Sequence, residues 1–70
     1  MKLDWKPVSD TLEHFAAQGE EKRHYTIDRN SMGYWTVAKY NDGVYKRQEV
    51  RISFAGAKAR AQIWENHDAR

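Results

Sequence analysis

The strongest apolar pattern in the chain lies in its last quarter. Positions i, i+3, i+7 and i+10 of one helical stripe are occupied by Phe54, Ala57, Ala61 and Trp64, and one flank is widened by Gly56, Ile63 and His67. Ser53 precedes the stripe, where an N-cap residue is expected. The pattern predicts a helix over residues 54–67 whose solvent side carries Lys58, Gln62, Glu65 and Asn66. Its alanines allow a close approach to a sheet.

Three stretches before this helix have the patterns of β-strands, at residues 23–29, 34–40 and 44–52. The side chains expected on one face are Tyr25 and Ile27, then Trp35 and Val37, then Val50 and Ile52. Residues 30–33 form a turn because asparagine and glycine accept a positive φ. Asp42-Gly43 suits a tight hairpin turn. We therefore predict an antiparallel meander of three strands.

Residues 9–18 have two interpretations. Trp5, Val8, Leu12 and Phe15 recur at helical spacing, with Ser9 as a possible cap and Gly19 as a possible end. A helix of about ten residues is not stable alone, so its apolar side would have to reach the core. The alternative is a fourth, edge strand at residues 14–17. The sequence leaves both open.

Together these elements predict an α+β fold with two layers, in which the helix packs on one face of the sheet. The expected core consists of Tyr25, Ile27, Trp35, Val37, Val50, Ile52, Ala57, Ala61 and Trp64, closed by Phe15 or Leu12. Counting by twos places the other side chains on the opposite face: His24, Thr26, Tyr34, Thr36, Tyr40, Tyr45, Arg47 and Arg51.

This opposite face is the candidate binding surface. Its proposed contact residues are Tyr34, Tyr40, Tyr45, Arg47, Arg51 and His24. Tyrosine and arginine are enriched in contact surfaces because both combine large area with hydrogen bonding. A simpler interpretation is that the tyrosines only shield the sheet and pair across strands.

Composition limits the remaining possibilities. Seventy residues predict one small domain. With no cysteine, there is neither a disulfide framework nor a Cys-ligated zinc site, and no apolar run resembles a signal peptide or a membrane span. The prediction is a cytoplasmic protein without membrane contact.

The charge is unevenly distributed although the net charge is only +2. Residues 1–21 carry two Lys against five acids, and residues 61–70 carry one Arg against two acids. Residues 22–60 carry nine Lys/Arg against three acids. The basic middle of the chain favours contact with phosphate or with an acidic protein surface.

Catalytic chemistry is not predicted. His14, His24 and His67 lie on separate elements without the spacing of metal ligands. The serines fall at cap and turn positions, and the isolated glycines form no phosphate-binding loop. We expect a protein that is not an enzyme and has no cofactor, no metal and no catalytic residue.

Short motifs give the chain an outline similar to the double-stranded RNA-binding domain. The residues concerned are Pro7-Val8-Ser9 with Leu12 and Phe15, then Tyr25-Thr26-Ile27, then Ser53 through Ala57-Lys58 to Ala61-Gln62. The chain has Phe54 and Ala55 where that family places lysines. The resemblance implies binding of double-stranded RNA. Nucleic-acid binding is therefore the alternative function, and from the residues it would use either stacking of single-stranded bases on the tyrosines or phosphate contacts of Lys22, Arg23, Lys58 and Arg60.

The chain also resembles small uncharacterised phage and prophage proteins, through Leu3-Asp4-Trp5, Tyr25-Thr26-Ile27 and Ala57-Lys58-Ala59-Arg60-Ala61. This resemblance implies an accessory protein that acts by contact. The leading prediction is therefore a non-catalytic protein that binds a host or phage protein, with inhibition of a host defence system as one such action. A weak homodimer that pairs exposed strand edges is a further alternative.

Overall fold

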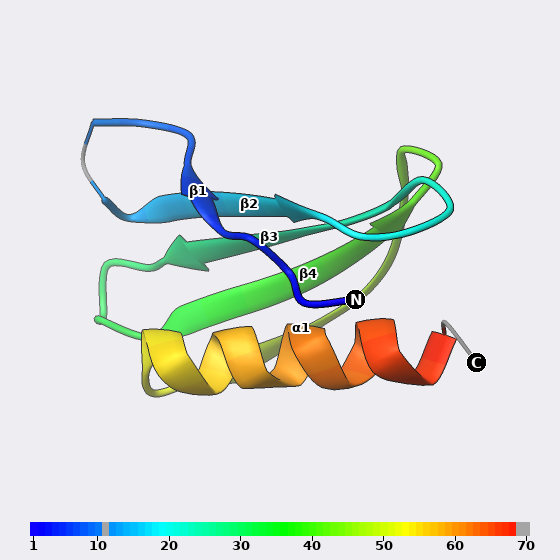
Figure 1. Ribbon diagram of the computed structural model, residues 1–70. Helices are drawn as coiled ribbons and strands as arrows, with labels where there is room; N and C mark the ends of the chain where they lie inside the picture. The colour runs from blue at the N-terminus through cyan, green and yellow to red at the C-terminus, as the bar shows by residue number, and fades with distance from the viewer. Residues whose placement is uncertain (11, 69–70) are drawn as a thin grey trace.

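The computed structural model describes residues 1–10 and 12–68 and contains one antiparallel sheet and one helix (Figure 1). The strands are β1 (Lys6–Pro7), β2 (His14–Gln18), β3 (Arg23–Arg29), β4 (Trp35–Asn41) and β5 (Val44–Arg51), and the helix is α1 (Phe54–Asp68). Each strand pairs with the next in sequence, giving the order β1-β2-β3-β4-β5. The α+β class is confirmed. The sheet has five strands, two more than the predicted meander.

The predicted turns form as their residues dictate. The Asn30 side chain accepts hydrogen bonds from the amides of Met32 (2.9 Å) and Tyr34 (3.0 Å), which closes the β3–β4 turn. Asp42 and Gly43 have φ values of 53° and 80°, as the primed hairpin turn between β4 and β5 requires. These two turns set the register of the central strands.

Residues 14–18 form a strand and not a helix. β2 pairs with β3 from His14↔Asp28 to Gln18↔His24, and its other side pairs with β1 through Ala16 and Phe15. The predicted edge strand is therefore partly covered. Leu12, with a φ of 58°, is 63% exposed, so Phe15 and not Leu12 closes the core. Residue 11 lies outside the described residues.

The helix covers one face of the sheet, and the N-terminal segment lies beside it (Figure 1). The buried core combines Leu3, Ala17, Tyr25, Ile27, Val37, Ala57, Ala61 and Trp64. Trp35 stands over Phe54, with ring centroids 5.1 Å apart. Leu3 was not predicted to be buried. The Leu3 amide donates to Gln62 Oε1 (2.8 Å), and this hydrogen bond holds the residue beside α1.

The helix begins where the sequence predicts. Ser53 Oγ accepts a hydrogen bond from the Gly56 amide (3.0 Å), so Ser53 is the N-cap. The helix ends at Asp68, one residue beyond the predicted limit. No helix in the part of the chain that the structure describes has both the length and the apolar character to span a membrane.

A β-bulge reverses the predicted faces of β5. Tyr40 pairs with Tyr45, whereas the preceding residue, Lys39, pairs with Arg47, so Lys46 is an extra residue in β5. One extra residue exchanges the two faces for all that follows it. Val50 (52% exposed) and Ile52 (83% exposed) were therefore wrongly assigned to the core.

Candidate functional site

The predicted binding face is only partly formed, by aromatic side chains on the uncovered side of the sheet. His24 pairs with Tyr40, and Tyr40 with Tyr45, so these three lie in one row across β3, β4 and β5. The His24 and Tyr40 rings stack at 4.7 Å, and the Tyr40 and Tyr45 rings meet edge to face at 6.0 Å. The row ends in Tyr45, which is half exposed on β5.

Tyr34 does not belong to this row. It precedes β4, in the turn closed by Asn30, and its side chain is 41% exposed. The register places it at the end of the sheet remote from Tyr40 and Tyr45, which lie next to the β4–β5 turn.

Arg47 and Arg51 lie on the helix side of the sheet, contrary to the prediction. Their partners in β4 are Lys39 and Trp35, which share a face with the buried Val37. The Arg47 guanidinium stands 4.7 Å from the centre of the Trp64 ring, where a cation is attracted to the ring face. The bulge at Lys46 is the reason, because it turns both arginines away from the aromatic row.

Three guanidinium groups converge on the single carboxylate of Glu49. Arg47 lies 3.3 Å and Arg60 3.5 Å from it, and Arg51 also pairs with it. Burial acts to raise the pKa of Glu49, yet the hydrogen bond from Arg51 and the charges of Arg51, Arg60 and Arg47 outweigh burial and lower it. One carboxylate faces three cations, so this cluster keeps an excess of positive charge.

A nearby lysine responds to the same positive potential. Burial first, and then the charges of Arg23 and Arg47, lower the pKa of Lys39. Asp68 at the end of α1 pairs with this lysine. Of the cations in this region, Arg47 and Arg51 lie on β5, the last strand of the sheet.

The aromatic row and the arginine cluster around Glu49 meet at β5. It is the last strand in the sheet order, so one side of its backbone has no strand partner among residues 1–10 and 12–68. Tyr45 and Val50 project from one face of this edge, and Arg47 and Arg51 from the other. A ligand that contacts both groups has to run along β5.

The four cations of the alternative nucleic-acid site do not form one patch. Arg23 is 4% exposed and bonded to Glu65, and Arg60 points at Glu49. Lys22 lies in the β2–β3 turn, 3.8 Å from Asp42. Lys58 is exposed on α1 and stands over the Phe54 ring. Arg23 was thus wrongly predicted to be available for phosphate.

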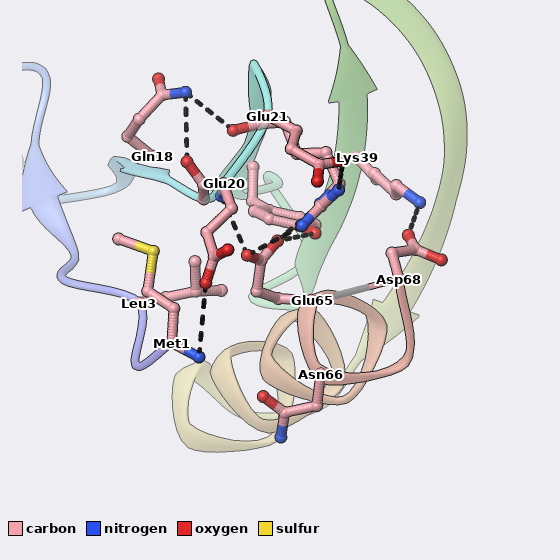
Figure 2. A network of polar contacts seen from close by, with 12 residues as sticks. Met1, Leu3, Gln18, Glu20, Glu21, Lys39, Glu65, Asn66 and Asp68 are labelled. Carbon is pink, nitrogen blue, oxygen red and sulfur yellow. Dashed lines mark hydrogen bonds and ion pairs between the residues drawn. The ribbon is translucent and has the colours of Figure 1, made fainter. Parts of the chain in front are cut away.

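The sequence also misplaced Glu65, which is fully buried and not on the solvent side of α1. Its carboxylate accepts hydrogen bonds from Arg23 Nε (2.9 Å), the Tyr25 hydroxyl (2.9 Å) and the Glu20 amide (2.9 Å). Figure 2 shows this network between α1 and the β2–β3 turn, with the Lys39–Asp68 ion pair beside it. A Cβ on Gly19 would lie 2.4 Å from Glu65 Oε1, so glycine is needed there.

The network is fully paired, which accounts for its shifted pKa values. Burial acts to raise the pKa of Glu65, but the hydrogen bonds from Arg23, Glu20 and Tyr25 prevail and lower it to about 2. Burial and the bond to Glu65 raise the pKa of Tyr25. With its donors satisfied, this cluster fastens the helix to the sheet and offers no free group to a ligand.

The described residues contain no group of three or more His, Cys, Asp or Glu side chains that could hold a metal ion. His14 bonds Asp28 through Nδ1 (2.6 Å), and His24 is stacked on Tyr40. Comparison of the chain with protein-family models, with curated proteins and with solved structures finds no match.

Proposed function

We propose that the protein is a non-catalytic binding module that takes an extended segment of another protein along β5. The observation that carries the proposal is the position of β5, an eight-residue strand at the margin of the sheet with exposed apolar and basic side chains. An edge strand of this kind offers unpaired backbone groups, and an added peptide strand obtains its affinity from bonds to them.

The chemistry of the edge favours a protein over a nucleic acid. Lys22 pairs with Asp42 and Lys58 lies over the Phe54 ring, so neither belongs to the arginine cluster around Glu49 beside β5. The His24 ring already stacks on Tyr40, so it does not offer both faces to a base. An extended protein segment, in contrast, needs only the strand edge and the side chains that flank it.

Charge also favours a different chain over a second copy. In an antiparallel pair of β5 strands centred on Glu49, Arg47 of one copy would stand opposite Arg51 of the other. Like charges placed directly opposite each other destabilise a strand pair. A homodimer through this edge is therefore the weaker alternative, and a partner with acidic side chains is the better match.

The wider role is proposed from the phage-type resemblance. A host or phage protein would be the partner, and the module would act by binding an extended segment of that protein along β5. Inhibition of a host defence system is one activity that such occupancy can produce.

The test is selection of ligands from a library of random peptides, followed by amide NMR titration. We expect the selected peptides to shift the amides of β5. Val50→Lys should weaken binding because it places a charge at the edge, whereas Met32→Lys, in the exposed β3–β4 turn, should not. Selective binding of oligonucleotides through Lys22 and Lys58, with affinity that falls steeply with salt, would contradict the proposal.

A further inference from the structure

We infer that the segment bound along β5 carries two acidic side chains four residues apart, which pair with Arg47 and Arg51, and apolar side chains between them. This inference rests on the proposed strand addition and specifies the sequence that the edge selects. It assigns an anion-recognition role to the arginines and an apolar-contact role to the opposite face of the same strand.

The spacing follows from the regular part of β5. Beyond the bulge, Arg47, Glu49 and Arg51 face the helix side, and Gln48 and Val50 face the uncovered side. Side chains directly opposite each other on neighbouring strands lie on the same face of a sheet. A segment added beside β5 therefore presents its first, third and fifth residues to Arg47, Glu49 and Arg51.

The charges determine which residues fit on the helix side. Arg47 and Arg51 each donate one hydrogen bond to Glu49, and its single negative charge balances only one of the three guanidinium charges around it. Their remaining N–H groups can donate to further carboxylates. Arg60 Nε is buried, makes no hydrogen bond and lies 3.5 Å from Glu49 Oε1, so it adds a third positive charge to this cluster. A third acid opposite Glu49 would be repelled, so an uncharged residue is required there.

The uncovered side of the edge has the opposite preference. Val50 is 52% exposed and Tyr45 is also 52% exposed, and both lie on this face. Apolar residues at the second and fourth positions of the added segment would cover the neutral Gln48 and the apolar Val50. The selected pattern is therefore acidic, apolar, neutral, apolar, acidic.

Two peptides of equal composition test this pattern. One contains Glu-Val-Thr-Val-Glu and the other Glu-Val-Thr-Glu-Val, each flanked by the same neutral residues. The first places both glutamates on the arginine side, and the second places one on each face. We expect the first to bind about tenfold more tightly at low salt, because only this peptide makes a charge-assisted hydrogen bond to each arginine.

Variants of the protein test the same pairing independently. Arg51→Gln should reduce the difference between the two peptides to about twofold or less, since one carboxylate loses its partner. Arg29→Gln is the matched control, because Arg29 faces the same side but lies on β3. Circular dichroism of each variant checks that the fold is retained.

The outcomes separate this inference from the proposed function. A preference for the first peptide that Arg51→Gln removes and Arg29→Gln does not supports both. Equal binding of the two peptides, with amide shifts in β5, overturns the acidic spacing alone. If neither peptide binds while library-selected peptides shift β5, the acidic pattern is wrong and strand addition stands. If no peptide shifts β5, both are overturned.

Discussion

Glu65 keeps its charge in a part of the molecule from which water is excluded. Its side chain is fully buried, and three donors from three different positions of the chain fix its oxygens. A buried charge is tolerated only when it is paired and hydrogen-bonded. This single side chain therefore joins the second half of α1 to the start of β3.

Replacing Glu65 with glutamine should be among the most destabilising single changes in the protein. Glu65→Gln leaves the buried Arg23 charge with only the exposed Glu21 as an anionic partner, which costs about 3 to 5 kcal/mol. Urea unfolding measures the loss, and Glu21→Gln is the control, because the Glu21 side chain is 80% exposed while pairing with the same arginine. A Glu65→Gln protein as stable as the control would contradict the structural role of the network.

Stability should also fall as the solution becomes acidic. The pKa of Glu65 is lowered from its ordinary value of 4.5 to about 2, so the unfolded chain binds the proton more readily. The contribution is complete above pH 4.5 and is lost as the pH falls towards 2, about 3 kcal/mol in all. Urea unfolding between pH 5 and 2 measures it. A Glu65 carboxyl NMR resonance that titrates near 4.5 would contradict this.

At the scale of elements, alternation predicts strands well but cannot detect an inserted residue. β3 has the predicted bounds, because Tyr25 and Ile27 alternate with polar residues without interruption. In β5 the extra residue, Lys46, is as polar as its neighbours, so the change of face leaves no sign in the sequence. That one residue accounts for the errors at Arg47, Arg51 and Val50, whereas Ile52 lies beyond the end of β5.

Deleting Lys46 should remove the bulge without exchanging the faces of β5. Tyr45 would still pair with Tyr40 and Arg47 with Lys39, now in a regular ladder. Cross-strand NMR contacts measure the register, and we expect the contact between Arg47 and Trp64 to persist. If Arg47 instead appears beside Tyr40, Lys46 is not the extra residue that forms the bulge.

The cap of α1 is an element feature that the sequence predicts directly. Ser53→Ala removes the bond to the Gly56 amide and should lower the free energy of unfolding by about 1 kcal/mol. Ser53→Asp should retain it, since its carboxylate can accept the same bond. Ser31→Ala, in the exposed β3–β4 turn, should change stability by less than about 0.5 kcal/mol. Equal effects at both serines would argue against the cap.

At the scale of the whole molecule, the two layers and the order of the central elements follow from periodicity and turn chemistry. The N-terminal part could not be predicted in the same way. Its apolar residues have helical spacing, but residues 14–18 pair with β3 as a strand instead. The candidate site was predicted as one face. The proposed site is instead an edge, because aromatic and basic residues of β5 lie on opposite sides of the same strand. Side chains of distant elements, such as Leu3 and Glu65, complete the core around it.

Amide hydrogen exchange, with and without the Glu-Val-Thr-Val-Glu peptide, tests most directly whether a partner adds a strand to this edge. The account predicts that alternate amides of β5 exchange more slowly at saturating peptide, because the outward backbone groups become hydrogen-bonded. The Lys6 amide, the only one in the Lys6–Pro7 strand β1 at the other margin, should be unchanged. Slower exchange confined to β1 and β2, with β5 unaffected by bound peptide, would contradict it.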